Sequence, residues 1–142
     1  MAQDRSEAVG LALEVSTPLG MQLNAQVEAV QVPSVAGEFG VLPGHVPLLA
    51  ALRPGVLRYR KDGVSVIAAV GSGYAEVDGK HVRLIADFFA RPEDVNTDEA
   101  RKDLGLAEER LKSAAAMSGG PELQEAQRAL DWARARLDLV AN

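Results

Sequence analysis

Residues 56–85 read VLRYRKDGVSVIAAVGSGYAEVDGKHVRLI, and two hairpin signals lie within them. The strand-like runs 56–60 and 64–70 flank Lys61-Asp62-Gly63, and the runs 74–77 and 81–85 flank a turn that contains Asp78-Gly79. An Asp-Gly pair supplies the positive φ angles of a tight turn between antiparallel strands. The stretch therefore predicts two β-hairpins, one directly after the other.

Alternating apolar residues predict further strands before these hairpins. Leu11, Leu13 and Val15 alternate with Ala12 and Glu14, which is the period-two pattern of a half-buried strand. Residues 27–32 repeat the pattern less cleanly. Many short strands separated by turns are typical of an antiparallel sandwich or barrel.

The composition changes at Arg91-Pro92. Valine occurs 14 times before this point and twice after it, whereas ten alanines lie within residues 100–141. Valine favours strands, and alanine is the strongest helix former. We therefore predict a β domain at residues 1–90 and a helical segment at residues 91–142.

Two helices are predicted in the second segment, at about residues 97–117 and 121–141. Asn96 and Glu99 form a capping-box pattern at the start of the first helix. Ser118-Gly119-Gly120-Pro121 ends that helix and opens the second, since Gly suits a C-cap and Pro the first helical position. Apolar residues recur in steps of three and four at Ala100, Leu104, Ala107, Leu111 and Ala114, and at Leu123, Ala126, Leu130, Ala133, Leu137 and Val140. So short a turn predicts an antiparallel helical hairpin.

The predicted contact between the two helices is thin. About half of its apolar members are alanine, and Gly105 weakens the first helix. An isolated hairpin of this kind is marginally stable in water. We therefore expect the hairpin to pack against the β domain, against a partner, or against each of them in different states.

Length and composition argue against several classes of protein. A chain of 142 residues is too short for two large domains. The net charge of -5 and the six aromatic residues argue against a nucleic-acid partner. Without cysteine, the chain forms no disulfide, iron–sulfur cluster or thiolate zinc site. The longest charge-free run, residues 39–52, is too short for a membrane helix, and the first residues lack the pattern of a secretory signal.

The residues also offer little for catalysis or metal binding. His45 and His81 are the two histidines, and neither has a ligand at helical spacing, so we expect no metal site. Ser72 lies in Gly71-Ser72-Gly73 but lacks the longer Gly-x-Ser-x-Gly elbow of a nucleophile. We interpret Ser72 as part of a bend between strands and expect no catalytic residue.

The densest glycine cluster lies in residues 37–44, directly before His45. It lacks the Gly-Lys-Ser/Thr ending and the following helix of a phosphate-binding loop. One interpretation is a loop in which glycines permit unusual backbone angles. The other is partner recognition by Glu38, Phe39 and His45, because loops carry function more often than cores do. Residue chemistry alone leaves these two interpretations equal.

A longer segment around this cluster resembles a known family. Residues 37–49 read GEFGVLPGHVPLL, which is similar to the signature of the epsilon subunit of F-type ATP synthases. The resemblance continues through residues 52–57, 71–77 and 82–87, whereas the helical tail matches by pattern more than by identity. It covers nearly the whole chain, with the same order of a β domain and two helices.

The resemblance implies an N-terminal ten-stranded antiparallel β-sandwich followed by a C-terminal antiparallel two-helix hairpin. It implies a non-catalytic subunit in the central stalk (rotor) of the proton-translocating ATP synthase, bound to the gamma subunit and resting on the c ring. Glu38 and His45 match positions at the foot of the sandwich, and Phe39 lies between them in the sequence. An acidic group and an imidazole on a rigid loop can make charge-assisted contacts with polar loops.

The resemblance also implies regulation by the hairpin. In the family the hairpin folds against the sandwich or extends along gamma into the catalytic alpha/beta head, where it hinders ATP hydrolysis. Arg128, Arg134 and Arg136 are the candidates for contact with acidic surfaces of the head. The alternative is a solvated helix face, because the second helix carries more acidic than basic residues.

ATP is the one ligand that the resemblance raises. Some relatives bind ATP at an Ile/Leu-Asp-x-x-Arg-Ala motif, and the matching stretch here is Thr97-Asp98-Glu99-Ala100-Arg101-Lys102. Asp98 and Arg101 match the motif, whereas the residues at either end depart from it and Glu108 stands where a further arginine is expected. A carboxylate repels phosphate, so we expect no cofactor and no strong ATP site.

We expect a soluble, peripheral subunit on the cytoplasmic face of the bacterial plasma membrane, since the chain begins without a transit peptide and without an inserting segment. Two other classes stay open. A freestanding β-sandwich adaptor or binding module would share the fold without the motor. A small hydrolase would need a catalytic set that could not be assembled from these residues.

Overall fold

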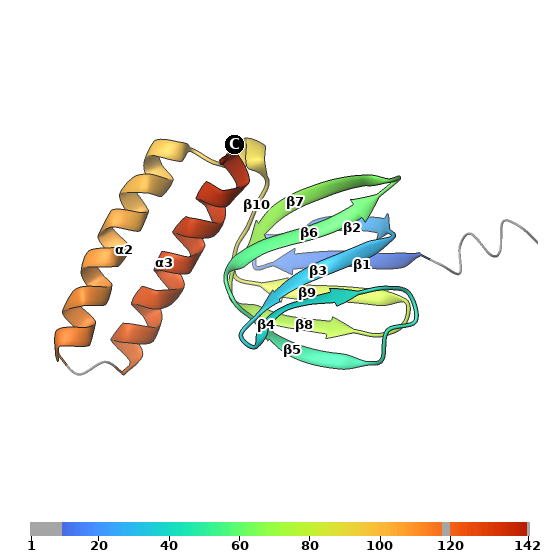
Figure 1. Ribbon diagram of the computed structural model, residues 1–142, viewed down its shortest axis with the longest axis horizontal. Coiled ribbons are helices and arrows are strands. Elements are labelled where there is room, and N and C mark those ends of the chain that lie inside the picture. The colour runs from blue at the N-terminus through green and yellow to red at the C-terminus, as the bar shows by residue number, and fades with distance from the viewer. Residues whose placement is uncertain (1–9, 118–119, 142) are drawn as a thin grey trace, which may run out of the picture.

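A computed structural model describes residues 10–117 and 120–141 and contains a β-sandwich followed by a helical hairpin (Figure 1). Ten strands come first, and two long helices come after them. The predicted fold class is therefore confirmed. Of the predicted turn between the helices, Ser118 and Gly119 lie outside the described residues.

Short strands separated by turns build the sandwich. They are β1 (Leu11–Thr17), β2 (Gly20–Val27), β3 (Ala29–Ser34), β4 (Gly37–Val41), β5 (Leu48–Leu52), β6 (Gly55–Lys61), β7 (Val64–Val70), β8 (Gly73–Val77), β9 (His81–Ala86) and β10 (Phe89–Ala90). The two hairpins predicted from residues 56–85 are β6–β7 and β8–β9, and both pairs are antiparallel.

The two hairpin turns differ in their chemistry. Asp62 and Gly63 have φ angles of 51° and 75°, the positive values predicted for an Asp-Gly turn. The second turn has no positive φ angle at its Asp-Gly pair, so that part of the prediction is wrong. Instead, Oδ1 of Asp78 accepts hydrogen bonds of 2.8 Å from the backbone N–H groups of both Lys80 and His81. The aspartate side chain closes this longer turn.

The strands join in a single sheet that folds over on itself. Neighbouring strands run in the order β10-β7-β6-β3-β5-β8-β9-β1-β2, and β4 pairs with β3 outside this path. The sandwich is antiparallel apart from the β1–β9 pair, in which Leu13 lies beside Val82 and Val15 beside Leu84. These two strands are far apart in the sequence, so no tight turn fixes their relative direction.

The apolar residues that alternate along the strands form the core of the sandwich. Leu11, Leu13 and Val15 are fully buried, as their spacing predicts. They belong to one apolar cluster that fills the sandwich and includes Leu57 and Leu84. Burial of this cluster supplies the main driving force for folding of the β domain.

The helices begin where the sequence predicts. A 3-10 turn, η1 (Pro92–Asp94), leads from β10 to α2 (Thr97–Met117), which is followed by α3 (Pro121–Val140). Oδ1 of Asn96 accepts a 3.0 Å hydrogen bond from the backbone N–H of Glu99, which confirms Asn96 as the N-cap. Among the described residues, no helix is both long enough and apolar enough to cross a membrane.

The helix α3 lies between α2 and the sandwich (Figure 1). The contact between the helices is built from small side chains, as predicted, because Ala100, Ala107 and Ala114 are the buried residues of α2. A thin contact of this kind contributes little apolar burial per turn.

A second buried row on α3 faces the sandwich. Asp131, Ala135 and Leu139 recur every four residues and are buried, although none of them is among the predicted apolar positions of this helix. Ala135 and Leu139 pack against Ala69 of β7 and Ala90 of β10. The hairpin is therefore held to the sandwich through α3.

Candidate interaction surfaces

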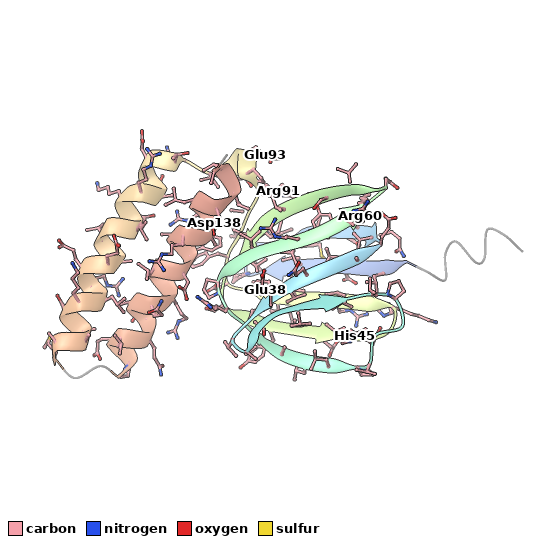
Figure 2. The ribbon with its side chains drawn as sticks, in the orientation of Figure 1. Glu38, His45, Arg60, Arg91, Glu93 and Asp138 are labelled. Carbon is pink, nitrogen blue, oxygen red and sulfur yellow. The ribbon has the colours of Figure 1, made fainter. Side chains whose placement is uncertain are left out.

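The predicted partner-binding residues lie at two ends of one strand. Glu38 is exposed at the start of β4, near the helices, whereas His45 lies in the loop beyond the other end of β4 (Figure 2). Phe39 packs against the sandwich core and is only partly exposed. The fold does not gather these three side chains into one cluster.

The loop that carries His45 is held by backbone contacts. Gly44 has a φ angle of 88°, and its N–H donates a 2.9 Å hydrogen bond to the Gly79 carbonyl in the β8–β9 turn. The His45 N–H donates to the Leu42 carbonyl at 3.1 Å. Gly44 is therefore required by its backbone angle, while the half-buried imidazole of His45 stays accessible at the rim. The structural and the functional interpretations of this loop are compatible.

A cleft of about 300 Å³ lies beside Glu38, between the sandwich and α3. Its charged lining residues come from both sides: Glu38, Arg53, Asp131, Arg134 and Asp138. Oδ2 of Asp131 accepts from Nε of Arg53 at 3.4 Å. The predicted partner-binding residue Glu38 thus shares this cleft with three charged residues of α3, Asp131, Arg134 and Asp138.

An apolar row that is not among the predicted sites crosses the outer face of the sandwich. Tyr74 of β8 lies opposite Ile85 of β9, and Ile85 is followed across the sheet by Ser16 and Met21. Tyr74 and Ile85 are 61% and 65% exposed. The predicted β-hairpin already implies this pair, because Tyr74 and Ile85 lie at similar distances before and after the same turn.

An ionic row lies beside the apolar row. Arg83 of β9 is 3.6 Å from the Glu14 carboxylate and 3.3 Å from the Glu76 carboxylate. Leu49 of β5 lies next to Glu76 in the same register and is exposed. Together, Met21, Leu49, Tyr74 and Ile85 with the Arg83 ion pairs form what we call the outer-face patch. Exposed apolar side chains that gather in this way mark interaction sites.

The three predicted regulatory arginines have different surroundings. Arg128 and Arg134 are exposed on α3. Arg136 donates from Nη2 to Oδ2 of Asp103 on α2 at 3.0 Å, and its guanidinium lies 5.4 Å from the centre of the Trp132 ring. Arg136 therefore joins the two helices in this closed arrangement, whereas Arg128 and Arg134 face solvent.

Stacked aromatic rings join α3 to the β9–β10 connection. The centroids of Phe88 and Trp132 are 5.4 Å apart, with an interplanar angle of 24°. They line a cavity of about 620 Å³ between sandwich and hairpin. Three arginines, Arg110, Arg128 and Arg136, and three carboxylates, Asp87, Asp103 and Glu125, also line it. The opposite charges balance, so the cavity does not favour an anion.

Ser72 opens onto the same cavity without a catalytic base. Neither histidine lines that cavity, because His45 lies in the β4–β5 loop and His81 contacts Asp78 in the β8–β9 turn. A Cβ atom at Gly71 would collide with the Asp87 carboxylate. The Gly71-Ser72-Gly73 segment therefore follows from close packing, as the predicted bend requires.

The predicted ATP-motif residues lie on an exposed surface. The guanidinium of Arg101 is 3.9 Å from the Asp98 carboxylate, and the two side chains are 69% and 96% exposed. Among the described residues, no group of three His, Asp or Glu side chains has the arrangement of a metal site.

Two side chains have shifted pKa values. Hydrogen bonds from the backbone of Lys80 and His81 lower the pKa of Asp78. Burial raises the pKa of Tyr59, with the charge of Arg91 acting in the opposite direction. The Asp78 shift thus arises from hydrogen bonds within a turn and the Tyr59 shift from burial in the sheet, and neither residue belongs to the outer-face patch.

Sequence comparison connects this fold to one family. Residues 10–92 match the family described as ATP synthase, Delta/Epsilon chain, beta-sandwich domain. The chain belongs to this family. The ATP synthase epsilon chain of Nitratidesulfovibrio vulgaris (strain DP4) is 40% identical over 132 residues, which are 93% of this chain and 96% of the relative. That of Geotalea uraniireducens (strain Rf4) is 37% identical over 131 residues, which are 92% and 94%.

Solved structures share the fold of this ATP synthase family member. A chain in the Euglena gracilis mitochondrial ATP synthase (OSCP/F1/c-ring) superposes with a TM-score of 0.72 at 21% identity, covering 89% of this chain and 79% of that one. A chain in the central stalk/c-ring structure of the Tetrahymena thermophila mitochondrial ATP synthase gives 0.52 at 15% identity, covering 82% and 96%. The predicted family, that of the ATP synthase epsilon chain, is therefore confirmed.

Proposed function

We propose that this ATP synthase subunit joins the gamma subunit to the c ring through its sandwich and restrains ATP hydrolysis through its helical hairpin. The observation that carries the first part is the outer-face patch. Tyr74 and Ile85 lie side by side on a rigid sheet, exposed to solvent beside a row of ion pairs. A surface of this kind suits the apolar face of a helix from gamma, with polar contacts at its border.

Substitution within the outer-face patch tests the contact with gamma. Tyr74→Arg and Ile85→Asp should each weaken binding of the full-length chain to the isolated gamma subunit by about tenfold or more, because each puts a charge into an apolar contact. Val64→Arg is the matched control, since Val64 is a strand residue with 61% exposure that lies on β7, away from the patch. Unchanged gamma binding by both patch variants would reject this face as the docking surface and favour a freestanding adaptor.

Glu38 and His45 are the residues that we propose to meet the c ring. Because they lie at opposite ends of β4, each is tested by itself. Glu38→Lys and His45→Ala should lower proton-driven ATP synthesis by the reconstituted complex, while Glu93→Lys, an exposed charge reversal elsewhere, should not. Wild-type synthesis with Glu38→Lys would remove Glu38 from the coupling contact.

The exposed arginines of α3 support the proposed inhibitory role. Arg128 and Arg134 are available for acidic surfaces of the catalytic alpha/beta head when the hairpin leaves the sandwich. Arg136 becomes available only after its contact with Asp103 is broken. A contact of Arg136 with the head therefore requires the Arg136–Asp103 ion pair to break first.

ATP is not expected to regulate this chain. Asp98 and Arg101 form an ion pair on an exposed surface, and Glu108 adds a negative charge on the same helix. Titration calorimetry of the full-length chain with ATP should give no saturable heat at millimolar nucleotide. A saturable signal that disappears in Arg101→Gln would overturn this expectation.

We place the subunit peripherally at the cytoplasmic face of the bacterial plasma membrane. Two observations support this placement. The relatives named above come from bacteria, and their similarity extends over nearly the whole chain. The subunit should leave washed membrane vesicles together with the catalytic head, and detergent should not be needed. Retention in stripped vesicles would contradict peripheral attachment.

A further inference from the structure

Asp131 is a charged side chain buried between α3 and the sandwich. Its side chain is 8% exposed, and within residues 10–117 and 120–141 Ser34 is the other buried polar residue. Asp131 begins the row that continues with Ala135 and Leu139, which pack on the sheet. A carboxylate at this place in an apolar docking row costs free energy unless it is paired.

Each oxygen of Asp131 has one donor, and the two donors belong to different parts of the molecule. Nε2 of Gln127, one turn earlier on α3, donates to Oδ1 at 3.1 Å. Nε of Arg53 donates to Oδ2 at 3.4 Å from the β5–β6 connection. When the hairpin leaves the sandwich, Asp131 keeps Gln127 but loses Arg53.

The position of Arg53 is fixed by the sandwich. Its backbone N–H donates a 3.3 Å hydrogen bond to the Pro33 carbonyl of β3, and Pro54 and Gly55 follow it directly. Its side chain is 57% exposed, so the guanidinium reaches from a solvated edge to a buried carboxylate. In the open state both charges would be solvated.

An ion pair of this kind selects one docking position. Apolar side chains of similar size often stabilise a contact as well as a buried ion pair does, so Asp131 adds little strength. It adds a penalty for misplacement, because a shift of α3 by one helical turn of about 5.4 Å would take the carboxylate away from Arg53 and leave it buried. The apolar members of the row, Ala135 and Leu139, would tolerate such a shift more readily, because they carry no charge and the sheet residues beneath them, Ala69 and Ala90, are small.

We propose that the Arg53–Asp131 pair is a latch that holds the helical hairpin in one closed position on the sandwich and lets it release without leaving a buried charge. The closed position follows from the contacts alone, whereas release of the hairpin and its effect on ATP hydrolysis rest on the proposed function. Glu38, Arg134 and Asp138 line the same cleft without taking part in the pair.

A buried thiol can measure release of α3, because the chain has no cysteine of its own. Ala69→Cys places one thiol on β7 beneath Ala135 and Leu139, where the side chain has 0% exposure. In the full-length chain this thiol should react with a maleimide at a rate proportional to the open fraction. All latch variants are made in this background.

The latch predicts a non-additive pair of substitutions. Arg53→Gln alone leaves Asp131 buried with Gln127 as its one donor, and should raise the labelling rate about fivefold. In the Asp131→Asn background the same Arg53→Gln change should alter the rate by less than about twofold, since no buried charge is left. Asp138→Asn and Arg58→Gln are matched exposed controls and should leave the rate unchanged.

Equal effects of Arg53→Gln in both backgrounds, or none in either, would overturn the latch. ATP hydrolysis by the complex that contains each variant is then measured separately. If labelling follows the latch prediction but hydrolysis is constant, the latch stands and the proposed inhibitory role of the hairpin fails. If neither measurement responds, the latch is wrong whatever the function.

Discussion

Nη2 of Arg136 on α3 lies 3.0 Å from Oδ2 of Asp103 on α2, so a residue predicted to contact the catalytic head instead ties the two helices together. The Arg136 side chain is 16% exposed and covers the Trp132 ring. Trp132 in turn stacks on Phe88 of the sandwich. Arg136 therefore stabilises the closed hairpin. A contact of Arg136 with the catalytic head would cost the free energy of the contacts with Asp103 and Trp132.

Loss of this contact should loosen α2. Arg136→Gln removes the ion pair and the guanidinium over the indole, and we expect a cost of about 1 kcal/mol because the Asp103 carboxylate is partly exposed. Amide hydrogen exchange of α2 should become faster, while that of the sandwich core should not change. Arg134→Gln, an exposed neighbour on the same helix, is the control. Equal exchange in α2 for both variants would show that Arg136 has no role in holding the hairpin.

Local signals in the sequence were sufficient for most of the fold. The hairpin runs around Asp62-Gly63 and Asp78-Gly79 and the cap at Asn96 depend on neighbours within a few residues, so they could be predicted. The parallel β1–β9 pair could not, because it joins segments that are far apart and no turn fixes its direction.

The sites were harder to predict than the fold. The separation of Glu38 from His45 depends on the direction of β4, and the burial of Asp131 depends on which face of α3 meets the sheet. Periodicity on α3 indicated the face toward α2 and missed the face toward the sandwich. Tyr74 and Ile85 were within reach of the hairpin register, but Met21 joins them through β1, which only the complete sheet order reveals.

The glycine at the start of β8 should not tolerate a side chain. A Cβ atom at Gly73 would collide with the carbonyl group of Ile85 and with the Cα of Ala86, all of which are backbone atoms of β9. Gly73→Ala should therefore lower the free energy of unfolding by about 3 kcal/mol or more, measured by urea denaturation. Gly40→Ala is the control, because nothing lies within 4 Å of its added Cβ, and it should be neutral or slightly stabilising. Equal stability of both variants would contradict the close β8–β9 approach.

The turn aspartate Asp78 should make the sandwich sensitive to acid. Its pKa is lowered in the folded state by backbone hydrogen bonds from Lys80 and His81, so its stabilising effect is present above its ordinary pKa of 3.8 and is lost as the pH falls through the lower folded value. Thermal melts should therefore separate wild type from Asp78→Ala most at neutral pH and least near pH 2. Asp62→Ala does not serve as a control, because Asp62 has a positive φ angle. A gap between wild type and Asp78→Ala that does not depend on pH would contradict this role for the ionised carboxylate.

Removal of the helical hairpin should separate docking from inhibition. We propose that the sandwich folds without residues 91–142, since its core is complete before α2 begins. A chain ending at Val95 would expose Ala69 and Ala90, which α3 covers, so its melting temperature should fall somewhat. It should still bind gamma like the full-length chain, because the outer-face patch lies on β1, β2, β5, β8 and β9. ATP hydrolysis by the assembled complex should rise, since the exposed arginines of α3 are gone. Unchanged hydrolysis together with normal gamma binding would exclude inhibition by the hairpin, whereas loss of gamma binding would show that the hairpin contributes to docking.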